Sequence, residues 1–278
     1  MARIVATAAL LAVSGAAGSS AYAAPTPACA LTSERLLRVE FDGSAPPAAA
    51  ILRGIASRLR TVPADSQIGA YAYIRVNMQA ADSALDPPCP QTVTAYAQEQ
   101  RWRADNGSGQ VTGTPWHHDP AAPPAVETTV YAAGELAGVL NGPVPAAPSA
   151  LAAALDANGH GVPTAARIRA VADLNGWHYL NRDARQAVLL FLADIDGITY
   201  RGAVTGYPGA IAVSADNDGW RELLVLDPRS GVVNAYEQIL LRDGQQLGVR
   251  TPYSNARTAY LDRGRTPQPD RVPGPPRH

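Results

Sequence analysis

The stretch QIGAYAYIRVNM at residues 67–78 decides the fold class, because apolar side chains alternate along it with aromatic and polar ones. A period of two is typical of a β-strand that buries one of its faces. The apolar face is predicted to hold Ala70, Ala72, Ile74, Val76 and Met78. The opposite face is predicted to hold Tyr71, Tyr73 and Arg75.

The next stretch, TVTAYAQEQRWR at residues 92–103, alternates in the same way and predicts a second long strand. One of its faces is predicted to hold Tyr96, Gln98, Gln100 and Trp102. The dipeptide Asn106-Gly107 follows this strand, and such a pair between alternating stretches is a strong hairpin signal. Residues 110–114 are therefore expected to return as a third antiparallel strand.

Helices and further strands follow in separate blocks. Helices are predicted at residues 46–59, 150–157, 165–180 and 184–195, with Ser149, Thr164 and Asn181 or Asp183 as N-terminal caps. Strands are predicted at residues 199–205, 210–215, 221–227 and 232–241, with a last edge strand at 256–261. This order favours an α+β fold over alternating βαβ units. We expect a curled antiparallel sheet packed on a layer of helices, similar to a half-barrel.

The N-terminus has the pattern of an export signal. Arg3 precedes an apolar run at residues 4–18, and Ala21-Tyr22-Ala23 has the small-x-small pattern of a cleavage site. We therefore expect a signal peptide at residues 1–23 and a single extracytoplasmic domain at 24–262. The mature chain is predicted to have no transmembrane span, so the protein is expected to be secreted or associated with the cell envelope. Retention of the signal as an anchor is the alternative.

Two proline-rich segments interrupt the predicted elements. Seven prolines lie in residues 115–148, which predicts a loop or lid without core elements. Five prolines and four arginines lie in residues 263–278, which predicts a disordered tail.

The chain has two cysteines, Cys29 and Cys89, and both follow the predicted signal. An even number of cysteines in an exported chain predicts one disulfide, and two free thiols are the alternative. Closing a loop of about 60 residues would stabilise the fold by up to about 4 kcal/mol.

All 23 basic residues are arginine, and the formal net charge of −1 excludes a dominant basic surface. Because phosphate binding needs clustered positive charge, we expect no nucleic-acid partner. The absence of lysine is what a GC-rich genome would produce. Selection for the planar, always-charged guanidinium group is the alternative interpretation.

One short segment, His117-His118-Asp119, concentrates side chains that can bind metal ions. A catalytic zinc ion needs about three protein ligands and one open position. The segment therefore suggests a metal-dependent hydrolase as an alternative function. A solvated polar loop is the favoured interpretation, so we expect no metal and no cofactor.

Aromatic side chains on the predicted strands form the candidate ligand site, which comprises Tyr71, Tyr73, Tyr96, Trp102 and Arg75. Such amphipathic rings on a curled sheet could contact a lipid or a polymer, although core packing is the alternative. Arg75, Arg101 and Arg103 lie close together in sequence and could bind an anionic head group.

Three motifs in a fixed order give a resemblance to a known family. Trp102 is followed by Asp105-Asn106-Gly107-Ser108-Gly109, a helix later runs into Ile195-Asp196-Gly197-Ile198, and a strand ends at residues 226–231. This order, over residues 48–261, resembles an uncharacterised family of actinobacterial envelope proteins known only by a locus tag. The resemblance implies an anchored or exported extracytoplasmic domain and no particular activity. The chain departs from the family in lacking a long N-terminal cytoplasmic segment and in reading VPAAP at residues 144–148.

The element order is also similar to the half-barrels of lipoprotein carriers and periplasmic stress sensors, an analogy that does not imply function. Since no catalytic group of residues is recognised, we expect a non-catalytic module that binds or senses an amphiphile or an envelope protein between sheet and helices. An extracytoplasmic sensor of envelope stress is a further alternative. The oligomeric state is not predicted.

Overall fold

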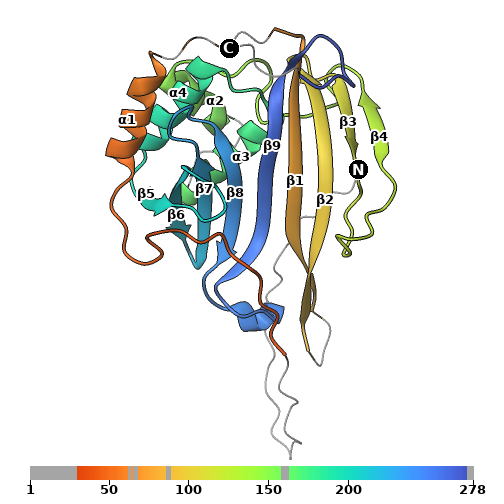
Figure 1. Ribbon diagram of the computed structural model, residues 1–278, viewed down its shortest axis with the longest axis vertical. Coiled ribbons are helices and arrows are strands. Elements are labelled where there is room, and N and C mark those ends of the chain that lie inside the picture. Colours follow the sequence, from red (N-terminus) through yellow and green to blue (C-terminus); the bar gives the residue numbers. More distant parts are fainter. Residues whose placement is uncertain are drawn as a thin grey trace, which may run out of the picture.

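A curled antiparallel sheet with helices on one face makes up the fold, as predicted (Figure 1). The computed structural model describes residues 30–61, 63, 65, 68–85, 89–157 and 163–273. Within them lie four α-helices and one open sheet of nine strands in the order β4-β3-β2-β1-β9-β8-β7-β6-β5. The predicted signal at 1–23 and Cys29 lie outside the described residues, so the signal and the disulfide stay predictions.

The helices are α1 (Ala49–Leu59), α2 (Pro148–Ala157), α3 (Thr164–Trp177) and α4 (Arg182–Ala193), and a short 3-10 helix lies at Gly244–Leu247. The strands are β1 (Tyr71–Ala84), β2 (Gln91–Ala104), β3 (Gly109–Gly113), β4 (Glu127–Tyr131), β5 (Thr199–Ala203), β6 (Ile211–Asn217), β7 (Trp220–Leu226), β8 (Val233–Leu240) and β9 (Tyr253–Thr266). The N-terminal cap of α4 is Asn181, one of the two predicted candidates, and its side chain accepts the Ala184 N–H; Asp183 lies in the first turn. The cap predicted at Thr164 is wrong, because Thr164 begins α3 and its hydroxyl donates to the Asp196 carbonyl.

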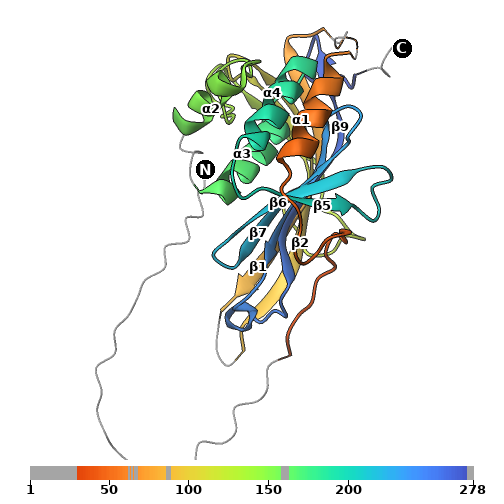
Figure 2. The same cartoon turned by 90° about the vertical axis from the view of Figure 1, so that its left-hand side faces the viewer.

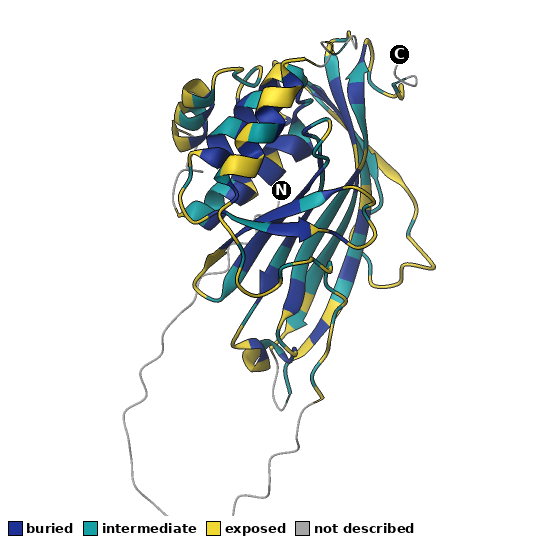
Figure 3. Cartoon of the chain, turned by 60° about the vertical axis from the view of Figure 1, so that its left-hand side comes forward, coloured by how far each residue is buried: buried dark blue, intermediate teal, exposed yellow. Residues whose placement is uncertain are grey.

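The main core lies between the sheet and the helices. Ile74 and Val76 of β1 are buried there with Leu189 and Leu192 of α4, so the even-numbered face of β1 is the apolar one, as predicted. Figure 3 shows the buried sides of the helices turned toward the sheet, and Figure 2 shows the helices gathered on one side of it. Below we call this the helix face of the sheet, and the opposite one the outer face.

Residues 31–47, which we call the N-terminal segment, cover part of the outer face. Leu37 and Val39 pack against a small outer core, a cluster of buried side chains that includes Leu223 and Val225 of β7. The segment also pairs with β5, because the backbone N–H groups of residues 40 and 41 donate to the carbonyls of residues 203 and 201. In Figure 1 it is the red-orange ribbon that crosses the lower part of the sheet. The outer edge of β5 is therefore occupied by the chain itself.

The predicted edge strand at 256–261 is wrong in length and position. Strand β9 has 14 residues and lies near the middle of the sheet, between β1 and β8. The predicted disordered tail is wrong for its first part, because residues 263–266 belong to β9. Polar residues interrupt the apolar alternation that would identify β9 in the sequence. Their hydrogen-bond partners lie far away in the chain: Arg263, for example, donates to the side-chain oxygen of Asn175 in α3. Residues 274–278 lie outside the described part.

The proline-rich segment at 115–148 is likewise more ordered than predicted. It contains the edge strand β4, which pairs with β3, and it buries Leu136, Val139 and Leu140. Its prolines flank these elements instead of interrupting them. In the described part of the chain, no helix is both long and apolar enough to cross a membrane.

Candidate functional site

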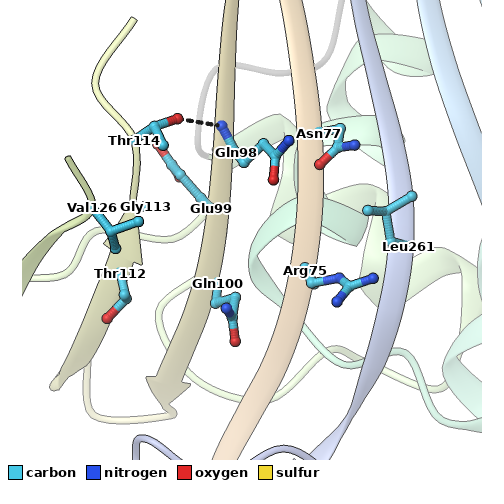
Figure 4. Close-up of a pocket in the computed structure, with 10 residues that line it drawn as sticks. All are labelled: Arg75, Asn77, Gln98, Glu99, Gln100, Thr112, Gly113, Thr114, Val126 and Leu261. Carbon is cyan, nitrogen blue, oxygen red and sulfur yellow. Dashed lines mark hydrogen bonds between the residues drawn. The ribbon is translucent and has the colours of Figure 1, made fainter. Parts of the chain in front are cut away.

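A groove of about 330 Å³ lies on the outer face, over β1, β2 and β3 (Figure 4). Its floor is polar and is formed by Arg75, Asn77, Gln98, Gln100 and Thr112. Two exposed apolar side chains, Val126 and Leu261, form its walls. A volume of this size is at the lower end of the range for ligand sites, about 300–1,000 Å³.

The register of the strands builds this floor. Asn77 pairs with Gln98, and Arg75 pairs with Gln100, so four side chains form a two-by-two array on the outer face. Such neighbours are about 4.8 Å apart across strands and about 6.8 Å apart along a strand. Leu261 projects beside the array because the register of β1 and β9 shifts between Arg75 and Val76.

Three of the four side chains in the array have no partner in the part of the chain that the structure describes. Among the described residues, the Arg75 guanidinium and the side-chain amides of Asn77 and Gln98 make no hydrogen bond or ion pair. The Gln100 amide oxygen accepts the Tyr73 hydroxyl at 3.3 Å. The dashed line in Figure 4 joins the Thr114 hydroxyl to the backbone N–H of Gln98, not to its side chain. The groove therefore presents donors and acceptors that a ligand can use.

The predicted aromatic candidates share the outer face, but most of them are already engaged. The rings of Tyr73 and Trp102 contact each other in a tilted arrangement, with centroids 5.2 Å apart and an interplanar angle of 45°, and both are almost fully buried. The Trp102 indole N–H donates to the Arg271 carbonyl at 2.6 Å, so the C-terminal residues cover this pair. The Tyr96 ring lies 6.2 Å from that of His117. Tyr71 is half-buried at the start of β1, so only Arg75 of the five predicted residues lines the groove.

Arg101 and Arg103 do not belong to this site, because their side chains point to the helix face. Arg101 donates to the Gly176 carbonyl, and its guanidinium lies 4.1 Å from the centroid of the Trp177 ring. Arg103 donates to the carbonyls of Leu136 and Leu140. Neither guanidinium is available to an anionic head group.

The structure does not bring His117, His118 and Asp119 together. His117 Nδ1 lies 2.8 Å from the backbone carbonyl of Asp119, whereas His118 Nε2 lies 2.8 Å from the Asp82 carboxylate. Within the described ranges, no three His, Cys, Asp or Glu side chains are arranged to hold a metal ion. The geometry therefore lends no support to a metal-dependent hydrolase.

A buried polar cluster on the helix face was not foreseen from the sequence. The carboxylate of Glu222 accepts the hydroxyl of Tyr236, the Gln238 amide at 2.9 Å and the Arg169 guanidinium at 3.2 Å. Burial raises the pKa of the Glu222 carboxyl, against the opposing effects of the Tyr236 hydrogen bond and the Arg169 charge. Because these groups bond to one another, the cluster stabilises the contact between α3 and the sheet.

The amide side chains of the groove were missed as site residues. The alternating pattern places Gln98 and Gln100 on one face but does not pair them with Asn77 and Arg75, which depends on the β1–β2 register. Searches against protein-family models and curated proteins find no match to this chain, so the site is interpreted from its geometry alone.

Proposed function

We propose that this protein is a non-catalytic, exported binding module of the cell envelope whose groove holds an extended segment of a protein partner. The observation that carries the proposal is the array of unpaired polar side chains formed by Arg75, Asn77 and Gln98. The location rests on the signal-like N-terminus and on the family resemblance. A role as a stress sensor is compatible with the same binding site.

The spacing of the array supports an extended peptide. A peptide in β conformation repeats every two residues, over about 6.8 Å, which matches the distance between alternate residues of β1. Primary amides such as those of Asn77 and Gln98 carry both a donor and an acceptor, and so does each peptide group. A peptide lying along β1 and β2 could therefore bond to both rows of the array.

The charge of the array supports an acidic peptide. Arg75 is exposed and has no side-chain partner among the described residues, and a guanidinium forms two parallel hydrogen bonds with a carboxylate. Asp262 is opposite Arg75 in the register, but its carboxylate accepts the backbone N–H of Arg263 and makes no ion pair with Arg75 among the described residues. An aspartate or glutamate of the ligand would supply the missing partner.

Two other ligand classes fit less well. Sugars bind preferentially where an aromatic ring is exposed, but Tyr73 and Trp102 on this face contact each other and are buried. An amphiphile between sheet and helices would need a cavity there. The cavity lined by Ala72, His178 and Ala184 has a volume of only about 60 Å³, far below that of a ligand site.

The test uses pools of acetylated and amidated pentapeptides with neutral flanking residues and a fixed central residue, either Asp, Glu, Asn or Gln. Binding is followed by NMR through the side-chain NH2 signals of Asn77, Gln98 and Gln100. We expect the acidic pools to bind roughly tenfold more tightly than the amide pools, because only they form a charge-assisted pair. Arg75→Gln should remove this difference, whereas Arg229→Gln, at an exposed turn, should not.

Each alternative outcome has a clear meaning. Equal binding of acidic and amide pools would contradict the role of Arg75. If no pool perturbs the three amide signals, the groove is not a peptide site. Perturbation of the same signals by trigalacturonate alone would assign the groove to an acidic glycan and overturn the proposal of a protein partner.

A further inference from the structure

A second and larger hollow lies on the outer face, between the N-terminal segment and strands β7 and β8. Its volume is about 630 Å³, nearly twice that of the groove. We call it the outer hollow and define it by its apolar lining of Leu37, Val39, Leu223, Ile239, Leu241 and Pro252. It is separate from the groove, because none of its lining residues lines the groove.

The lining residues show why the hollow stays open. Leu37 and Val39 pack on one side, against Leu223 and its neighbours in the small outer core. Close to this contact, the backbone N–H of Leu37 donates to the buried Glu237 carboxylate at 3.1 Å. The N-terminal segment is therefore held across the sheet while Leu241 and Pro252 stay partly uncovered. When an apolar chain displaces water from an apolar surface of this kind, the free energy of the system falls, which favours binding.

The charged groups at the rim of the hollow are of two kinds. Asp42 pairs with Arg221 at 3.0 Å, and Glu34 accepts the Thr94 hydroxyl at 2.6 Å, so both carboxylates are engaged. In contrast, the guanidinium groups of Arg35 and Arg38 are exposed, and neither makes a hydrogen bond or ion pair with the described residues. The formal charges of the lining, Arg35, Arg38 and Arg221 against Glu34 and Asp42, sum to +1, so the rim is net positive.

We propose that the outer hollow binds a single-chain anionic amphiphile, with its alkyl chain against the apolar lining and its head group at Arg35 and Arg38. The apolar lining and the unpaired positive rim each match one end of such a molecule. The proposal does not depend on the peptide groove, which lies over different strands. It places an amphiphile outside the sheet, under the N-terminal segment, instead of between the sheet and the helices.

The experiment is calorimetric titration of the full mature protein near neutral pH with octanoate and decanoate, each below its critical micelle concentration, and with uncharged decanol below its solubility limit. We expect decanoate to bind with a stoichiometry of one. Octanoate should bind roughly tenfold more weakly, because two fewer methylene groups are buried. Decanol should also bind several-fold more weakly, because it lacks the charge that Arg35 and Arg38 would pair.

Three variants locate the site. The double variant Arg35→Gln/Arg38→Gln should weaken decanoate binding roughly tenfold and leave decanol binding unchanged. Leu241→Trp should weaken both by filling the hollow. The matched control, Arg60→Gln/Arg229→Gln, removes two exposed arginines elsewhere and should change neither. Circular dichroism establishes that each variant is folded.

Several results would overturn the proposal. These are the absence of decanoate binding, equal affinity for decanoate and decanol, or decanoate binding that Leu241→Trp leaves intact. Protection of residues 31–42 from hydrogen exchange by the acidic peptide pools, and not by decanoate, would assign the hollow to a peptide. Failure of decanoate binding leaves the peptide groove untouched, since Arg75→Gln and the NH2 signals of Asn77 and Gln98 report on that site independently.

Discussion

His178 is a buried histidine whose burial makes the stability of the protein depend on pH. Its Nε2 accepts the backbone N–H of Leu140 at 3.3 Å, so the neutral ring is the one that fits. Burial, together with the nearby charge of Arg103, lowers the pKa of His178 to about 3. In the unfolded chain the pKa returns to about 6.5, so protonation at intermediate pH favours the unfolded state.

The protein is therefore expected to lose stability as the pH falls below about 6.5 and to keep losing it toward about pH 3. Between about pH 7.5 and pH 5, His178 alone should lower the free energy of unfolding by about 2 kcal/mol. Urea unfolding at both values measures the loss. His178→Gln should be less stable at neutral pH but should show a pH dependence smaller by this amount. An unchanged pH dependence in the variant would contradict the assignment.

Glu237 is a buried carboxylate that forms an ion pair with Arg257. It is fully buried, and it accepts hydrogen bonds from the Ser254 hydroxyl at 2.7 Å and from the Arg257 Nε at 3.1 Å. Arg257→Gln would leave this charge without its ion-pair partner and should cost about 3–5 kcal/mol. Chemical denaturation gives the value. Glu237→Gln/Arg257→Gln should recover part of the loss, because the buried charge is then removed.

An exposed pair provides the control for this prediction. Arg53 and Asp194 form an ion pair at 2.8 Å with both side chains more than half exposed. Arg53→Gln is expected to change stability by less than about 1 kcal/mol, since water screens such pairs. Equal effects of Arg53→Gln and Arg257→Gln would contradict the importance of burial.

At the scale of elements, β9 joins the two halves of the sheet. It pairs with β1 on one side and β8 on the other, so strands β1–β4 are joined to strands β5–β8 only through it. Its helix face contributes Tyr260, whose hydroxyl donates to the Ala172 carbonyl of α3 at 2.7 Å. The C-terminal part of the chain is therefore a structural centre of the domain.

Truncation tests this role of β9. Deleting residues 263–278 removes the end of β9 and the Arg263–Asn175 hydrogen bond. We expect the shortened protein to lose its cooperative thermal transition and its near-ultraviolet circular dichroism. Deleting residues 274–278 leaves β9 and the Arg263–Asn175 hydrogen bond in place and should change the melting temperature by only a degree or two. A stable protein after the longer deletion would show that β9 can end earlier.

The sequence predicted some elements better than others for local reasons. β1, β2 and the Asn106-Gly107 turn carry their signals within a few residues, and the structure confirms them. Strand β4 and the second half of β9 carry no such local signal. Proline-rich segments flank β4, and arginines interrupt the alternation in β9. The arginines are tolerated because α3 and neighbouring loops supply their hydrogen-bond partners, such as Asn175 for Arg263 and Gly69 for Arg265.

At the scale of the whole molecule, the predicted export can be tested together with the disulfide. The intact mass of the secreted protein should correspond to a chain that begins at Ala24. Cys29 and Cys89 should react with iodoacetamide only after reduction. Reduction should lower the free energy of unfolding by up to about 4 kcal/mol, because the unfolded chain loses its cross-link. Labelling of two thiols without reduction would contradict the disulfide, and retention of residues 1–23 would indicate an anchor.

The sequence by itself determined the α+β class, the apolar face of β1 and the Asn106-Gly107 turn, because these depend on alternation and local turn chemistry. It also placed Arg75 on the right face. Only the tertiary structure decided which side chains remain free. The register of β1 and β2 brings Arg75, Asn77 and Gln98 into one array, while the C-terminal residues cover Tyr73 and Trp102. The N-terminal segment creates the outer hollow by crossing strands nearly 200 residues away in the chain. Such pairings are long-range, and no local pattern carries them.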